Sequence, residues 1–153
     1  MTVTRYWEDF REGQVFDLGS ATVSKDDIVD FGRRWIPQPF HVDEASARDS
    51  PFGGLIASGW HTACLFMRLY YEHLLAGSAS LGSPGVRDMR WLEPVRPGQV
   101  LCASATVLRT SVSSTTRGRG TVEMRWECAR PDGVVVLRMI GTAFFARRPC
   151  PVS

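Results

Sequence analysis

The clearest pattern in the chain is a strict alternation of apolar and charged residues in its second half. The apolar positions are Val122, Met124, Trp126 and Cys128, and between them lie Glu123, Arg125 and Glu127. A period of two is typical of a strand with one buried and one solvent-facing side, as in an antiparallel sheet. Apolar runs over 86–92, 100–108 and 134–146 predict three more strands, and Pro97-Gly98 and Pro131-Asp132-Gly133 mark turns between them. We expect a bulge near Gly141 in the last strand.

The longest helical pattern runs from Ser58 to Ala76. One stripe of it consists of Ala63, Phe66, Met67, Tyr70 and Leu74, and most other sides are apolar too. A helix that is apolar almost all round should be buried on most sides. Ser58 is a suitable N-cap and Gly77 a suitable residue after the C-terminus. One buried helix against an antiparallel sheet predicts an α+β fold.

The first fifty residues predict smaller elements. A strand over 14–23 precedes a helix that begins after Ser24, a good N-cap with acidic residues in the following turn. Pro37 and Pro39 should end that helix and impose an extended turn. A further short helix is expected over 43–49. The Gly/Ser-rich stretch 77–85 is short enough to be a loop, so we expect a single domain over 1–153.

Composition excludes several classes of protein. A net charge of +2 is too small for a nucleic-acid-binding surface. No run of about 18 apolar residues predicts a membrane span, and the first ten residues lack the pattern of a signal peptide. We therefore expect a cytoplasmic protein that binds neither nucleic acid nor membrane. The four cysteines, Cys64, Cys102, Cys128 and Cys150, are too widely spaced for a metal-ligand pair, so we expect four free thiols and no metal.

Two motifs carry the candidate chemistry. The first is Pro-Gln-Pro-Phe-His over 37–41, and the second is Gly-Gly-Leu-Ile-Ala-Ser-Gly-Trp-His over 53–61. The first resembles the Asp-x-Asn-Pro-Leu-His motif of MaoC-like dehydratases and (R)-specific enoyl-CoA hydratases, with Gln38 in the Asn place and His41 in the His place. The second resembles the family's Gly-Gly-x-Ile-Ala-His-Gly segment, with Ser58 where His is common and Gly59 kept. The segment 90–101 is similar to the family's strand-turn-strand, so the resemblance covers nearly the whole chain.

The resemblance implies a hot-dog fold, in which an antiparallel sheet wraps one long helix, and a homodimer or larger homo-oligomer. It implies an acyl-CoA or acyl-carrier thioester as ligand, a place in fatty acid metabolism, and no cofactor. The expected reaction is reversible addition of water to an enoyl thioester. In the catalytic roles we expect His41, which can move a proton at neutral pH, and the Gly59 N–H at the helix start, which can hold the thioester oxygen. Gln38 and Ser58 are expected to bind substrate.

One departure from the family pattern leaves alternatives open. Five residues before His41, where the family has its catalytic Asp, this chain has Ile36. An acyl-thioester-binding domain without catalysis is therefore an alternative, and an acyl-CoA thioesterase is a second one, for which the central helix offers only Glu72 as a carboxylate. Asp43 could stand in for the missing Asp, although it is better placed as a helix cap. The proline-rich turn should direct a side chain at position 36 where the family's Asp points, so we expect Ile36→Asp to raise hydratase activity, or create it, at least about tenfold.

Overall fold

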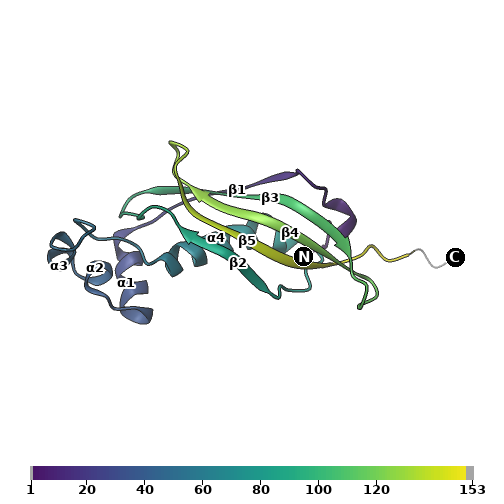
Figure 1. Cartoon of the computed structure of the whole chain (residues 1–153), viewed down its shortest axis with the longest axis horizontal. Helices are drawn as coiled ribbons and strands as arrows, with labels where there is room; N and C mark the ends of the chain where they lie inside the picture. Colours follow the sequence, from purple (N-terminus) through teal and green to yellow (C-terminus); the bar gives the residue numbers. More distant parts are fainter. Residues whose placement is uncertain (1, 151–153) are drawn as a thin grey trace.

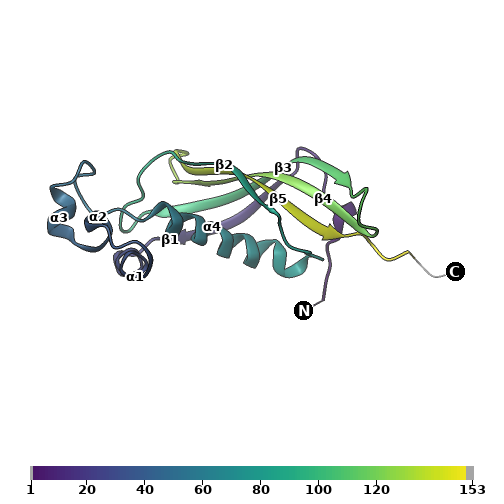
Figure 2. The same ribbon diagram turned by 60° about the horizontal axis from the view of Figure 1, so that its bottom comes forward.

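The computed structural model describes residues 2–150. Its five strands form one antiparallel sheet in the order β1-β3-β4-β5-β2. The strands are β1 (Val15–Thr22), β2 (Gly85–Trp91), β3 (Val100–Val112), β4 (Arg119–Ala129) and β5 (Val135–Ala146). The helix α4 (Gly59–His73) lies along one face of the curved sheet (Figures 1 and 2). The predicted α+β hot-dog fold is confirmed.

The remaining elements are short and lie around this centre. They are η1 (Trp7–Asp9), α1 (Lys25–Trp35), α2 (Pro39–Val42), α3 (Glu44–Arg48) and η2 (Leu75–Gly77). Figure 1 shows α1, α2 and α3 gathered beyond one end of the sheet, next to the start of α4. Both motifs found in the sequence lie at this end of the molecule.

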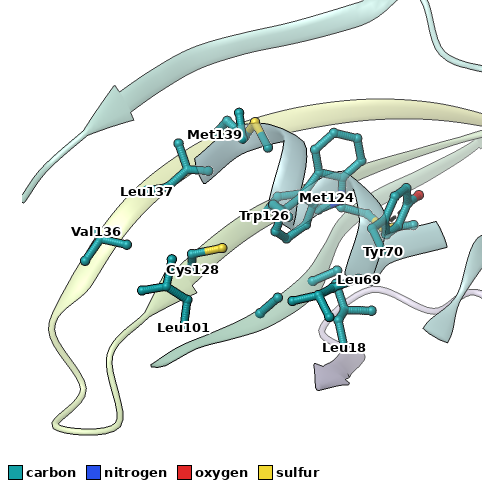
Figure 3. Close-up of a cluster of buried hydrophobic side chains, with 14 of the residues drawn as sticks. Leu18, Leu69, Tyr70, Leu101, Met124, Trp126, Cys128, Val136, Leu137 and Met139 are labelled. Atoms are coloured by element: carbon teal, nitrogen blue, oxygen red, sulfur yellow. Dashed lines mark hydrogen bonds between the residues drawn. The ribbon is translucent and has the colours of Figure 1, made fainter. Parts of the chain in front are cut away.

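The core lies between α4 and the concave face of the sheet (Figure 3). Trp126 of β4 is its largest buried side chain, and the Trp126 ring lies 5.5 Å from that of Phe66 and 4.9 Å from that of Tyr70, both on α4. Trp126 also explains Gly141, because a Cβ at Gly141 would come within 2.1 Å of the indole. The β4–β5 register is regular at Gly141, so the bulge expected near Gly141 is wrong; the register shift in β5 lies at Val136. The neighbouring strand β2 has another irregularity at Asp88, which has a positive φ of 52°.

Most helix ends follow their sequence signals. Ser24 caps α1 by accepting a hydrogen bond from the Asp27 N–H, and α1 stops at Trp35. Two expectations fail. Pro39 begins the helical turn α2 rather than continuing an extended segment, because a first-turn proline has no N–H that the helix needs. The long helix ends at His73, before the predicted Gly77, since the chain tightens into the 3₁₀ turn of η2.

One face of α4 does not contact the sheet. Trp60 and Tyr71 are 54% and 57% exposed, and Met67 and Cys64 are exposed beside them. In the single chain α4 is therefore not buried on most sides, contrary to the prediction. As for membranes, no helix within residues 2–150 combines the length and apolar character needed to cross a bilayer.

Candidate functional site

His41 is a buried histidine on the short helix α2. It is 5% exposed, and its Nδ1 lies 2.8 Å from the carbonyl oxygen of Ile56. A carbonyl oxygen can only accept, so Nδ1 carries the hydrogen and donates it. Nε2 is then left with a free lone pair in the neutral ring, which is the form that a general base requires. Gly32 of α1 allows this packing, because a Cβ there would come 3.0 Å from the Cβ of His41.

Backbone hydrogen bonds join three distant segments around His41. The N–H of Ile56 donates to Phe40 O at 3.0 Å, and the next N–H, of Ala57, donates to Val95 O at 2.8 Å. The segment 55–57 is buried and apolar, so these bonds are shielded from water. These bonds hold three segments side by side: α2 with His41, the segment before α4, and the segment after β2.

Gly59 is the first residue of α4. Ser58 caps the helix, since its side chain accepts from the Trp60 N–H at 3.2 Å. The N–H of Gly59 lies at the helix start, where backbone donors have no partner inside the helix and the dipole is positive. The indole of Trp91 packs against Gly59, and a Cβ at Gly59 would lie 2.3 Å from that ring. A glycine is required here for packing as well as for access to its N–H.

His41 and Gly59 line the same cavity, which has a volume of about 290 Å³. Its walls are mostly apolar and come from α2, from α4 and the segment before it, from β2 and the turn after it, and from β5: Phe40, Phe52, Ile56, Ala57, Thr62, Trp91, Leu92, Glu93, Pro94, Val95 and Val136. The expectation that these two residues share one pocket is met. A space of this kind can hold an acyl group between a base and a hydrogen-bond donor.

The other two residues that we expected to bind substrate, Gln38 and Ser58, do not line the cavity. Gln38 is exposed at the start of α2, where its carbonyl oxygen accepts from the His41 N–H at 2.9 Å. Ser58 is buried and is used as the cap of α4. In this structure, therefore, Gln38 helps to hold His41 and Ser58 helps to hold the first turn of α4, which begins at Gly59. Their substrate-binding roles stay predictions.

Ile36 lies in a separate apolar hollow. It is half-buried and lines this hollow with Phe31, Trp35, Trp60 and Cys64. Trp60 meets Trp91 edge to face, with ring centres 5.2 Å apart, and Trp91 belongs to the cavity of His41. The contact between the two indoles thus joins the hollow of Ile36 to the cavity of His41, and Ile36 lines only the first of them. The idea that an aspartate at position 36 would face His41 is not supported by this geometry.

The carboxylates nearest to His41 in the sequence are used elsewhere. Asp43 caps α3 by accepting from the N–H and hydroxyl of Ser46, and the hydroxyl hydrogen bond lowers the pKa of Asp43. The Glu44 carboxylate lies 2.7 Å from Lys25 Nζ. Glu93, in contrast, lines the cavity. Sequence reasoning missed it, although a charged residue in the otherwise apolar run Trp-Leu-Glu-Pro-Val was a signal.

His61 is a packed histidine outside this cavity. Its ring stacks on Phe31 at 5.0 Å, and its Nδ1 is buried without a hydrogen-bond partner. Burial lowers the pKa of His61, outweighing the opposite effect of the Asp27 carboxylate. As for metals, no group of three or more His, Cys, Asp or Glu side chains within residues 2–150 is arranged to hold an ion.

The chain is similar in sequence to known proteins. The family described as "MaoC like domain" matches residues 9–126. The chain is 37% identical over 101 residues to the uncharacterized protein YdeM of Bacillus subtilis, a match that covers 66% of this chain and 72% of YdeM.

Solved structures extend the similarity to the whole fold. A MaoC-like dehydratase from Rhodospirillum rubrum superposes with a TM-score of 0.85 at 36% identity, over 96% of this chain and 100% of the other. The (R)-hydratase PhaJ1 of Pseudomonas aeruginosa, at 20% identity, has the same fold with a TM-score of 0.74, over 97% of this chain and 95% of the other. From its sequence match over residues 9–126 and its fold, the chain belongs to the MaoC-like dehydratase family.

Proposed function

We propose that this chain is a hydratase or dehydratase that reversibly adds water to a 2-enoyl thioester of CoA or of an acyl carrier protein. The family supplies the class of reaction. The observation that carries the proposal is the hydrogen bond of His41 Nδ1 to Ile56 O, which leaves Nε2 as the ring nitrogen available for proton transfer in a cavity that Gly59 also lines.

His41 would transfer the proton, and Gly59 would stabilise the negative charge on the thioester oxygen. As the water oxygen bonds to C3, one of its protons passes to His41 Nε2, and electron density moves to the thioester oxygen. The Gly59 N–H donates to that oxygen in the enolate-like intermediate, and removing such a donor costs about 2.7–4 kcal/mol in comparable sites. The imidazolium then returns the proton to C2, so that one water is added overall. Ser58 contributes by holding the first turn of α4 in place.

The size of the cavity favours a short acyl group. Its volume of about 290 Å³ lies at the lower end of the range for ligand cavities, roughly 300–1,000 Å³. Behind it, the space between α4 and the sheet is filled by Phe66, Tyr70 and Trp126, which are all 2% exposed or less. Crotonyl-CoA, with four acyl carbons, is therefore the substrate of choice for a first assay.

We further propose a homodimer that covers the exposed face of α4. Trp60, Met67 and Tyr71 present an apolar surface to solvent on one helix, and two-fold assemblies are the common way to cover such a surface. Sedimentation should give a dimer at micromolar concentration, and Tyr71→Glu should shift it toward monomer. A stable monomer of the unaltered chain would contradict this proposal.

The test of function is loss of enoyl-thioester absorbance when the purified chain is added to crotonyl-CoA. We expect hydration by the unaltered protein and a decrease of about 10²–10⁴-fold in His41→Gln, the usual effect of losing a general base. His73→Gln is the matched control, because His73 lies at the far end of α4 and does not line the cavity. If His41→Gln kept its activity, His41 would not be the catalytic base.

A second candidate is an acyl-thioester-binding domain without catalysis, which the apolar Ile36 in the family's Asp position favours. It predicts binding of saturated and unsaturated acyl-CoA without turnover. A thioesterase is less well supported, because Glu72, the carboxylate considered for it, lies on the exposed side of α4 and pairs with Arg68 at 3.0 Å. Release of free CoA without hydration would indicate that reaction.

A further inference from the structure

We propose that Glu93 is the carboxylate that works with His41, in place of the aspartate that Ile36 replaces. This inference rests on the proposed hydratase function. Its starting observation is that Glu93 lines the cavity together with His41 and Gly59, whereas Ile36 lines a different hollow. The carboxylate would thus come from the turn after β2 rather than from the segment 36–41 that carries His41.

The backbone on both sides of Glu93 is fixed to the walls of the cavity. The N–H of Leu92 donates to Val136 O of β5 at 2.9 Å, and the carbonyl oxygen of Val95 accepts from Ala57 at 2.8 Å. Val95 is 3% exposed, and Pro94 restricts the chain between the two anchors. Glu93 is therefore carried on a segment whose position relative to His41 is set by hydrogen bonds, even though its own side chain is exposed.

The Glu93 carboxylate is also free to bind a ligand. Asp43 is occupied as a helix cap and Glu44 in an ion pair with Lys25. Among residues 2–150, by contrast, the Glu93 side chain has neither an ion-pair nor a hydrogen-bond partner. The Glu93 carboxylate and His41 Nε2, on two residues that line one cavity, would provide two acceptors for one water molecule.

In the reaction, the attacking water donates one hydrogen to His41 Nε2 and the other to the Glu93 carboxylate. The oxygen bonds to C3, the first proton passes to Nε2, and the C2=C3 π electrons move toward the thioester oxygen held by Gly59. The proton on His41 is then delivered to C2. Glu93 keeps its hydrogen bond to the new hydroxyl group and is unchanged at the end, so the net change is the addition of one water.

The experiment compares Glu93→Ala, Glu93→Gln and Glu93→Asp in the full chain with crotonyl-CoA. Losing the acceptor should lower kcat by about 100-fold or more in Glu93→Ala, with KM changed less than about threefold. Glu93→Gln, which keeps a neutral acceptor, should fall in between, and Glu93→Asp should stay within about tenfold of the unaltered protein. Glu44→Ala is the matched control, with no expected loss. Thermal unfolding of all four should be unaltered, because both residues are exposed.

The outcomes separate this inference from the proposed function. If the unaltered chain hydrates crotonyl-CoA and depends on His41, but Glu93→Ala retains its kcat, the role of Glu93 is refuted and the hydratase function stands. If the unaltered chain has no hydratase activity, both proposals fail. Glu93-dependent release of CoA without hydration would also overturn the inference. A graded loss in the order Asp, Gln, Ala, with Glu44→Ala unaffected, supports it.

Discussion

Replacing Gly59 with alanine tests whether the close packing of Trp91 against the start of α4 sets the shape of the cavity. The new Cβ would lie 2.3 Å from Trp91 Cε2 and 2.5 Å from Nε1, whereas non-bonded carbon atoms are in favourable contact at about 3.5–4.0 Å. The indole must therefore move by roughly 1 Å. Trp91 is 47% exposed, so the ring can move toward solvent without disturbing the core.

The expected effect is on activity more than on stability. Alanine is favoured over glycine in helices by up to about 1 kcal/mol, which offsets part of the cost of displacing the Trp91 ring. We expect the free energy of unfolding to change by less than about 1 kcal/mol, or roughly 4 °C in Tm. A displacement of about 1 Å at a reacting site can reduce the rate about 100-fold, so kcat/KM for crotonyl-CoA should fall by one to two orders of magnitude.

Gly141→Ala provides the matched control. Its Cβ would come within 2.1 Å of Trp126, but that ring is 2% exposed and cannot move into solvent. Overpacking of a core costs about 1–3 kcal/mol, so here stability should fall while the folded protein keeps its activity. Thermal unfolding, tryptophan emission and crotonyl-CoA hydration distinguish the two variants. Full activity with unaltered emission in Gly59→Ala, or a loss of stability equal to that in Gly141→Ala, would refute the reasoning.

Three further predictions follow from the structure. Ile36→Asp should give no gain in hydration, because position 36 faces another hollow, and should lower stability on the order of 1–3 kcal/mol; a tenfold gain in the assay would contradict this. Burial lowers the pKa of His61 from its ordinary 6.5, so below that pH the unfolded chain binds more protons than the folded chain. Tm should therefore decrease as the pH is lowered from about 7.5 to 5, and His61→Phe should reduce this decrease. Burial raises the pKa of Cys128 to about 12, so in a thiol titration it should react only after denaturation, whereas the exposed Cys102 should react in the native protein.

Features that depend on a few neighbouring residues were predictable from the sequence. The alternation over 122–128 predicted β4, because a sheet with one buried face selects apolar residues at every second position. Ser24 and Ser58 predicted the starts of two helices, since a capping side chain bonds to an N–H two or three residues away. The motif resemblance then identified His41 and Gly59 as candidate site residues, and the structure places both in one cavity.

Two of the wrong predictions depend on packing between distant parts of the chain. Gly141 predicted a bulge, but its role is to leave room for Trp126 on the neighbouring strand. The apolar pattern of α4 predicted burial on most sides, yet one face of the helix is exposed in the single chain. Apolar composition shows that a surface needs covering, and not whether the same chain covers it.

The composition of the site shows the same division. Local sequence determined that His41 follows a proline-rich turn and that Gly59 begins a helix. Only the tertiary structure decided that Ile36 lines a different hollow from His41, five residues away, while Glu93, 52 residues away, lines the same cavity as His41. The physical reason is the set of backbone hydrogen bonds that align residues 40, 56–57 and 95. Such bonds form between any backbone groups that the fold brings together, so no local pattern of side chains records them.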